Sequence, residues 1–157
     1  MMKKVRRLSY IYTLLVVLLT ACTGRVIYYK YQPVPQTVWS SDKPILFNID
    51  SVRHEGDYKF QLSIRTGSSF PFQALWIVVE QHWTNPTTTR LDTIICPISD
   101  DRGNFTGQGI SVYQQNYDIG TYTISKGSKA KIKISHIMRR EQLPGVTDVG
   151  LQMVRVD

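Results

Sequence analysis

The sequence is poor in the residues that build metal and catalytic centres. It has two cysteines and three histidines, and His54, His82 and His136 lie on separate segments without a metal-ligand spacing. No glycine-rich phosphate loop follows an apolar run, no serine elbow is present, and no pair of carboxylates stands out as an acid and a base. These absences exclude a zinc site and argue against an enzyme, so we predict no catalytic residues, no metal and no cofactor.

An excess of positive charge is also missing once the start of the chain is set aside. The net charge is +7, but Lys3, Lys4, Arg6 and Arg7 account for four of the 19 basic residues. Without them the chain carries 15 basic and 12 acidic residues, a net of +3. A balance of this size does not indicate a nucleic-acid partner.

What the sequence does have is an export signal. The basic head precedes an uncharged, mostly apolar run from Leu8 to Leu19, and small residues then lead into Cys22. Leu19-Thr20-Ala21-Cys22 resembles the lipobox of bacterial lipoproteins, which implies cleavage before Cys22 and a diacylglycerol on its sulfur. We therefore predict a signal peptide at residues 1–21 and lipid attachment at Cys22, which makes membrane lipid the first predicted partner.

An uncleaved signal anchor is the alternative for this stretch. The uncharged run from Leu8 to Gly24 only just reaches the ~17 residues of the shortest spanning helices, and four serine and threonine residues dilute it. We favour the lipoprotein interpretation. Once Cys22 is acylated, Cys96 is the only thiol left and no internal disulfide can form. Cys96 ends the strand-like run Leu91–Cys96, where we expect a buried, inert thiol.

The mature chain is predicted to be one domain. Residues 22–35 form a lipid-anchored N-terminal segment, which includes an extended stretch at Arg25–Tyr31 and a proline-containing break at Gln32–Gln36. Residues 36–157 form a single β domain, whose length is sufficient to bury a core. No segment shows a sustained helical period, and there are no internal repeats.

A period of two predicts strands throughout this domain. Ile45–Asp50 and Tyr58–Arg65 alternate apolar and polar residues, with Arg53–Asp57 as a hairpin loop between them. Ala74–Glu80 is apolar on both faces and is predicted to be a central strand, paired with Arg90–Ile98 across a loop at 82–89.

The second half continues in the same way. Asp100–Asn104 is predicted to be a capped turn rather than a calcium loop, because it lacks alternating oxygen ligands and a distal glutamate. Four further strands are expected: Phe105–Tyr113, which two glycines should make irregular, Tyr117–Ile124, Ala130–Ile137 and Val149–Val156. Ile137–Arg140 is interpreted as either a helical turn or a strand end. About eight to ten strands with polar turns predict an all-β fold, an antiparallel β-sandwich of jelly-roll type.

Several blocks of the sequence carry a family resemblance. They are Ser69–Glu80 (SFPFQALWIVVE), Leu91-Asp92-Thr93, the glycines at 103, 107 and 109, Ile137-Met138-Arg139, and Leu143–Leu151 (LPGVTDVGL). In this order and spacing they resemble the gliding motility-associated lipoprotein family GldH of Bacteroidetes. Ile137 stands where the family usually has alanine, and Leu151 stands where phenylalanine is common. We interpret the blocks as scaffold rather than as a binding site.

The resemblance implies a function. It indicates an envelope lipoprotein associated with gliding motility and the linked protein-secretion machinery, which acts without catalysis as a tethered domain that binds envelope proteins of that apparatus. Thr23-Gly24 places no acidic residue directly after the cysteine, which by analogy with other lipoproteins points to the outer membrane, on its periplasmic side.

Carbohydrate binding is the alternative function. Jelly-roll sandwiches often bind glycans through exposed aromatic side chains, and Trp39, Trp83, Tyr113 and Tyr117 are candidates for stacking on sugar rings. A coplanar row of exposed rings would support an outer-membrane, carbohydrate-binding lipoprotein, whereas rings turned inward would exclude it. A hydrolase would need a pair of acids across a cleft, which the sequence does not indicate.

Overall fold

The computed structural model describes residues 25–156, so Cys22 and the predicted signal peptide lie outside the described residues. The described chain forms a short 3₁₀ helix, η1 (Pro35–Thr37), and ten strands: β1 (Arg25–Pro33), β2 (Val38–Ser40), β3 (Ile45–Ile49), β4 (Gly56–Gly67), β5 (Ala74–Thr84), β6 (Thr88–Pro97), β7 (Val112–Ile124), β8 (Lys129–His136), β9 (Gln142–Pro144) and β10 (Val146–Arg155).

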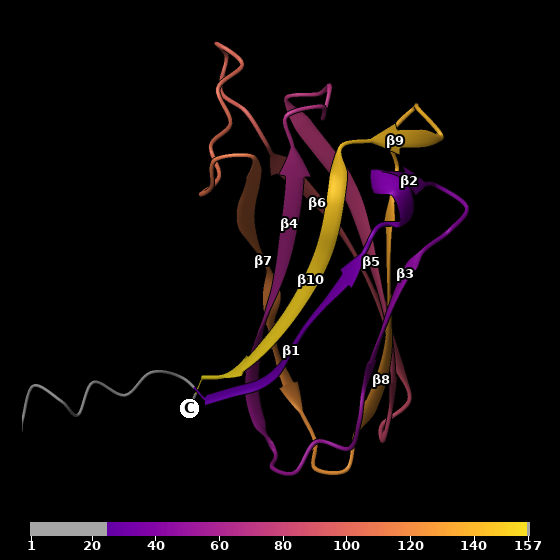
Figure 1. Ribbon diagram of the computed structural model, residues 1–157. Helices are drawn as coiled ribbons and strands as arrows, with labels where there is room; N and C mark the ends of the chain where they lie inside the picture. The colour runs from indigo at the N-terminus through magenta and orange to yellow at the C-terminus, as the bar shows by residue number, and fades with distance from the viewer. Residues whose placement is uncertain (1–24, 157) are drawn as a thin grey trace, which may run out of the picture.

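Eight of these strands form two antiparallel sheets that face each other (Figure 1). The β10 sheet has the order β1-β10-β4-β7, the β5 sheet has the order β3-β8-β5-β6, and β2 pairs with β9 at one end. The pairs β1–β10, β3–β8, β4–β7 and β5–β6 are nested, as in one long hairpin rolled into two layers. This is the jelly-roll arrangement, and the predicted fold class is confirmed.

The core lies between the two sheets, because alternate side chains along each strand point into the space between them. Phe60, Leu62 and Ile64 of β4 are fully buried, as are Leu75 and Ile77 of β5. Each such side chain contributes about 1.5–3 kcal/mol through its removal from water. The predicted buried thiol is confirmed, because Cys96 of β6 belongs to the same core and burial raises its pKa to about 12.

The N-terminal segment is part of the sandwich. Arg25 to Pro33, which the sequence analysis set apart within an anchor segment, pair along their length with Arg155 to Asp148 of β10. The β-branched and aromatic residues of this stretch suit an edge strand. The sandwich therefore includes Arg25, which is only three residues after Cys22.

Two predicted connections differ from the structure. Arg53–Asp57 was expected to close a hairpin, but β3 and β4 belong to opposite sheets, so this link crosses the sandwich. A period of two shows which face of a strand is buried, but not which strand lies beside it. Phe105–Tyr113 was expected to be an irregular strand, but most of it is a loop with isolated bridges, and β7 begins at Val112.

The loop between β6 and β7 is held by its own contacts. The Asp100 carboxylate accepts hydrogen bonds from the backbone N–H groups of Arg102 and Asn104, at 2.9 and 2.8 Å. This confirms the capped turn. The rings of Phe105 and Tyr113 stack with centroids 4.5 Å apart. These contacts replace the strand pairing that the sequence predicted.

The two ends of the sandwich differ in their connections. β1 starts and β10 finishes at the lower end in Figure 1, which we call the anchor end because Cys22 precedes β1. The β4–β5 link, residues 68–73, and the β2–β9 pair lie at the opposite end, which we call the far end. β10 runs between the ends with 10 residues, or about 30 Å at ~3.3 Å per residue.

Candidate protein-binding surface

The outer face of the β5 sheet exposes several large apolar side chains, among them Trp76 of β5 and Leu91 and Ile95 of β6. β5 is central, between β8 and β6, as predicted. Its residues Leu75, Ile77 and Val79 point into the core, whereas Trp76 and Val78 point outward. Only one of the two apolar faces of Ala74–Glu80 therefore packs into the core, and the other face is exposed to solvent. Within residues 25–156, no element covers the other side.

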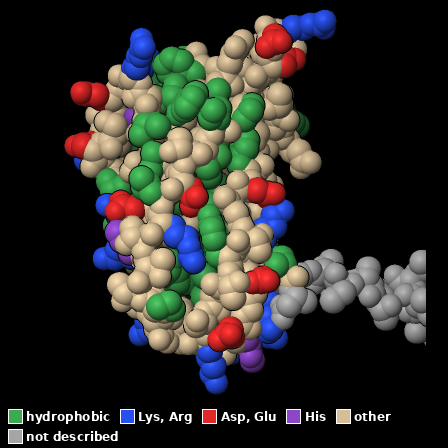
Figure 2. Space-filling view, turned by 180° about the vertical axis from the view of Figure 1, so that it is seen from behind, with side chains coloured by type: hydrophobic (Ala, Val, Ile, Leu, Met, Phe, Trp, Pro, Cys, Tyr) green, Lys and Arg blue, Asp and Glu red, His purple; other side chains and the backbone are tan. Residues whose placement is uncertain are grey.

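A groove of about 590 Å³ opens on this face at the far end. Trp76 is 44% exposed, Phe72 37% and Ile137 51%, so these side chains contribute little to the core. Figure 2 shows the hydrophobic side chains of this side gathered in its upper half. Met138, Arg139 and Arg140 complete the lining. We call these six residues the groove.

The groove is preformed by contacts with the sheet. β8 ends at His136, but the next residue, Ile137, still bonds to β5: its backbone N–H donates to the carbonyl oxygen of Trp76 at 2.9 Å. The Trp76 backbone N–H points to the Met138 Sδ at 3.4 Å. Phe72 packs edge-on against the buried Phe70, with ring centroids 6.0 Å apart. The segment after β8 is neither a helical turn nor a strand, yet it is fixed to β5.

The groove unites two sequence blocks that lie far apart in the chain. The first block contains Phe72 and Trp76, and the second is Ile137-Met138-Arg139. The last block, Leu143–Leu151, behaves differently: Leu143, Val149 and Leu151 are fully buried, so this block is scaffold. The motif therefore divides into a structural part and a surface part.

The apolar surface extends from the groove along β6. Ile95 lies directly opposite Trp76 in the β5–β6 pair, and Leu91 lies opposite Glu80 on the same face. Both are exposed. Directly opposed side chains on one face of a sheet are near neighbours, so Ile95 continues the apolar surface beyond Trp76. We call the groove together with Ile95 and Leu91 the outer patch.

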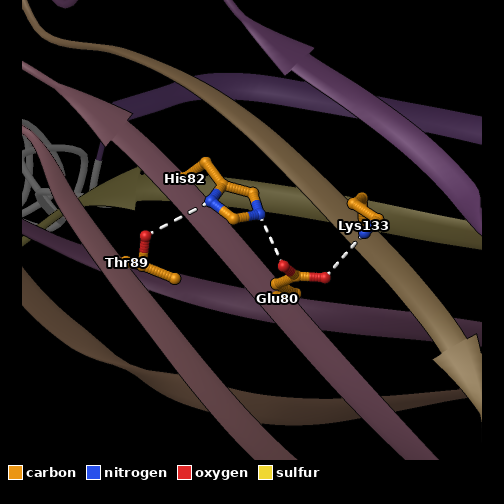
Figure 3. A network of polar contacts seen from close by, with 4 residues as sticks. All are labelled: Glu80, His82, Thr89 and Lys133. Atoms are coloured by element: carbon orange, nitrogen blue, oxygen red, sulfur yellow. Dashed lines mark hydrogen bonds and ion pairs between the residues drawn. The ribbon is translucent and has the colours of Figure 1, made fainter.

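Figure 3 shows a charged network around Glu80. Because β5 runs from Ala74 at the far end through Trp76 and Glu80 to Thr84, the network borders the outer patch on the side of the anchor end. The Glu80 carboxylate accepts a hydrogen bond from the Lys133 Nζ at 2.8 Å and one from the His82 Nε2 at 2.6 Å. These two donors hold the pKa of Glu80 below its usual range. When Nε2 carries the proton of a neutral ring, His82 Nδ1 can accept from the Thr89 hydroxyl, 3.3 Å away.

This network is a polar border rather than a reactive centre. Glu80 stays ionised at neutral pH and is already engaged on both oxygens, so it has no proton to donate as a general acid. Among residues 25–156, no group of three or more histidine, cysteine, aspartate or glutamate side chains is arranged to hold a metal ion. An apolar centre with a polar rim is the usual arrangement of a protein–protein interface.

The structure does not bring the predicted glycan-stacking residues together. Trp39 and Trp83 are 2% and 4% exposed and belong to the core. Their indole N–H groups donate to the Lys43 carbonyl and the Gln81 side chain, at 3.2 and 3.1 Å. Buried rings offer no face to a sugar, which corrects the prediction for both tryptophans.

Tyr113 and Tyr117, the two tyrosines of that prediction, are only partly exposed, and each contacts β6 or the loop that follows it. The Tyr113 ring stacks on Phe105. The Tyr117 hydroxyl donates to the Pro97 carbonyl oxygen at 2.5 Å, and burial raises the pKa of this phenol. The four predicted residues therefore do not form a row. The groove residues were not predicted as a site from the sequence, although the second apolar face of Ala74–Glu80 was a signal for them.

The fold and this surface define a class of protein: a jelly-roll β-sandwich that follows a lipoprotein signal and exposes an apolar sheet face. The family follows from the sequence, because the model of the GldH lipoprotein family matches residues 26–153, and the chain belongs to this family. The resemblance is confirmed. Membership makes the protein a membrane-anchored lipoprotein, linked by its family to gliding motility. In residues 25–156, no helix has the length and apolarity needed to cross a membrane.

Similar solved structures are distant in sequence. The globular domain of zebrafish complement 1qA protein is 11% identical, covers 86% of this chain and 98% of its own, and has a TM-score of 0.43. A Sulfurospirillum deleyianum protein is 12% identical, with coverages of 83% and 98% and a TM-score of 0.44. A ruminal GH26 endo-β-1,4-mannanase is 10% identical over 87% of this chain, with a TM-score of 0.40, and the chain spans 21% of its length. No curated protein sequence matches.

Proposed function

We propose that this protein is a non-catalytic lipoprotein of the outer membrane that faces the periplasm and presents the outer patch to envelope proteins of the motility and secretion apparatus. The single observation that carries this proposal is the exposure of Phe72, Trp76 and Ile137 in one preformed groove. Exposed apolar groups that are fixed in place and rimmed by charge mark interaction sites.

The composition of the outer patch supports a protein partner. Tryptophan, phenylalanine, methionine and arginine are enriched at protein interfaces, and tryptophan and arginine dominate binding energy there. The outer patch contains all four residue types. Lysine and glutamate, which interfaces tend to exclude from their centres, lie in the network around Glu80 at the border.

The tether supports the same reading. Arg25 is the third residue after Cys22, which gives the link a reach of about 10 Å at ~3.3–3.6 Å per residue. Lipid on Cys22 would hold the anchor end at the membrane, and the groove lies at the far end, about 30 Å along the strands. Two or more acyl chains give stable anchoring where one gives only marginal binding.

Affinity capture after crosslinking in the native envelope tests this proposal. We expect the wild-type chain to retain motility or secretion proteins, and the double variant Trp76→Ser/Ile137→Ser to lose them while remaining folded. Ile110→Ser is the matched control, because Ile110 is an apolar residue 91% exposed on the β6–β7 loop, outside the outer patch. Equal recovery of the same proteins by the double variant and by the wild type would refute the role of the outer patch.

A further inference from the structure

We propose that the groove binds a protein segment in which an acidic side chain stands next to an aromatic or aliphatic one. This inference rests on the proposed function and specifies the chemistry of the partner. It follows from three features that the groove combines: an apolar floor, a fixed shape, and two arginines with no carboxylate in the lining.

The floor selects an apolar anchor. Trp76 and Phe72 supply aromatic surface, and Ile137 supplies aliphatic surface beside them. The Met138 thioether lies against the Trp76 backbone and is a soft, adaptable contact for an aromatic ring. A single aromatic or branched side chain that fills such a groove is a common way for a short segment to be recognised.

The charge selects an acid beside that anchor. Arg139 and Arg140 are exposed at the groove, and within residues 25–156 neither makes an ion pair. Arg140 uses its Nε to donate to the Gln142 carbonyl at 3.0 Å, which leaves its terminal N–H groups to other acceptors. Arginine recognises carboxylates with two parallel hydrogen bonds, which are stronger next to apolar surface that excludes water.

The acids of the sheet do not compensate these arginines. Glu80, on the same outer face, is held by Lys133 and His82, and no carboxylate lines the groove. Glu141 directly follows Arg140 and is exposed, but it neither lines the groove nor forms an ion pair with either arginine. The lining of the groove is therefore positively charged and partly apolar. An acidic and apolar segment is complementary to it in both respects.

Other occupants match the groove less well. A second copy of this chain docked groove to groove would bring the same arginines together, which costs energy. The residues before Arg25 start from the anchor end, and their own charged residues are basic. An anionic lipid would satisfy the arginines, but it needs no preformed groove at the far end. We therefore commit to a protein segment.

Site-specific photocrosslinking of the full lipoprotein in its native envelope provides the test. Phe72→benzoylphenylalanine places the probe in the groove with an aromatic side chain retained, and Ile110→benzoylphenylalanine is the control outside it. The crosslinked peptide is sequenced and then synthesised in two forms, with its natural acids and with the matching amides. Binding of both peptides to the detergent-solubilised lipoprotein is measured by fluorescence anisotropy.

We expect the crosslinked segment to contain an acid beside an apolar residue, and the acidic peptide to bind about 10-fold more tightly than its amide form, as the loss of one charged hydrogen-bonded pair predicts. The double variant Arg139→Gln/Arg140→Gln should remove this preference, so that the acidic and the amide peptides bind with similar affinity. Lys131→Gln, an exposed cation of β8 that does not line the groove, should leave the preference intact.

The outcomes separate this inference from the proposed function. A crosslinked protein segment without an acid, or a preference that survives in the double arginine variant, overturns the acidic chemistry and leaves the interaction function standing. A crosslink only to lipid, or only to a second copy of this chain, overturns the protein segment as occupant. No protein crosslinked at position 72 above the level at position 110 would overturn both proposals.

Discussion

Gly145→Ala should destabilise the domain far more than an alanine at a glycine that has free space for a Cβ. Gly145 has φ +88°, and a Cβ there would lie 2.4 Å from the Phe70 backbone nitrogen and 2.5 Å from its Cα. The left-handed backbone costs an alanine about 1 kcal/mol. Relief of the overlap with the Phe70 backbone adds about 2 kcal/mol, as for other overpacked sites. The total is about 3 kcal/mol.

Gly103→Ala is the matched control, because Gly103 has φ +82° and no atom within 4 Å of a Cβ. Its cost should be the backbone term alone, about 1 kcal/mol. Urea denaturation of a chain that begins at Thr23 would measure both variants. At about 2 kcal/mol per molar urea, the midpoint should fall by about 1.5 M for Gly145→Ala and by about 0.5 M for Gly103→Ala. Equal shifts would refute the close packing of Gly145 on Phe70.

Three further predictions follow from burial and from the tether. Burial raises the pKa of the Cys96 thiol to about 12, so iodoacetamide at pH 8 should label it only after unfolding, and labelling of the folded domain would contradict the burial. Burial lowers the pKa of His136, so the folded state binds a proton at this ring less well than the unfolded chain does, where the pKa is about 6.5. The urea midpoint should therefore fall as the pH drops below about 6.5, and His136→Gln should reduce this dependence. Cys22→Ser should leave the domain folded but unanchored, and its retention in membranes after a carbonate wash would contradict the tether.

The periodicity of the sequence was sufficient for the strands but not for their arrangement. Tyr58 to Arg65 alternate so regularly that β4 could be placed with its buried face, and β4 indeed buries Phe60 and Leu62. The crossing of the chain from β3 to β4 was missed because a polar link such as Arg53–Asp57 suits a hairpin and a sheet crossing equally well. The pairing of strands that are distant in the chain depends on packing between layers.

The aromatic residues show a second limit. Trp39 and Trp83 looked available for a ligand, because a tryptophan in a mixed polar segment gives no indication of its burial. In the structure Trp39 packs edge-on against His136, 5.3 Å between ring centroids, and Trp83 packs against Phe60 at 5.9 Å. Both partners lie in other strands far away in the chain. Long-range contacts of this kind are decided by the fold and not by the local sequence.

The groove was hidden for a related reason, although half of its signal was present. A strand needs one apolar face for the core, and Ala74–Glu80 has two; the position of β5 in a two-layer sandwich leaves Trp76 in solvent. The other half comes from Ile137 and Arg139, which occupy a segment without a regular period. This segment is held at the groove by the contacts of Ile137 and Met138 with the Trp76 backbone. A second apolar face on a central strand therefore predicts that part of the protein surface is apolar and exposed. The charge of that surface, and with it the chemistry of the partner, becomes known only from the fold, because arginines of another segment supply it.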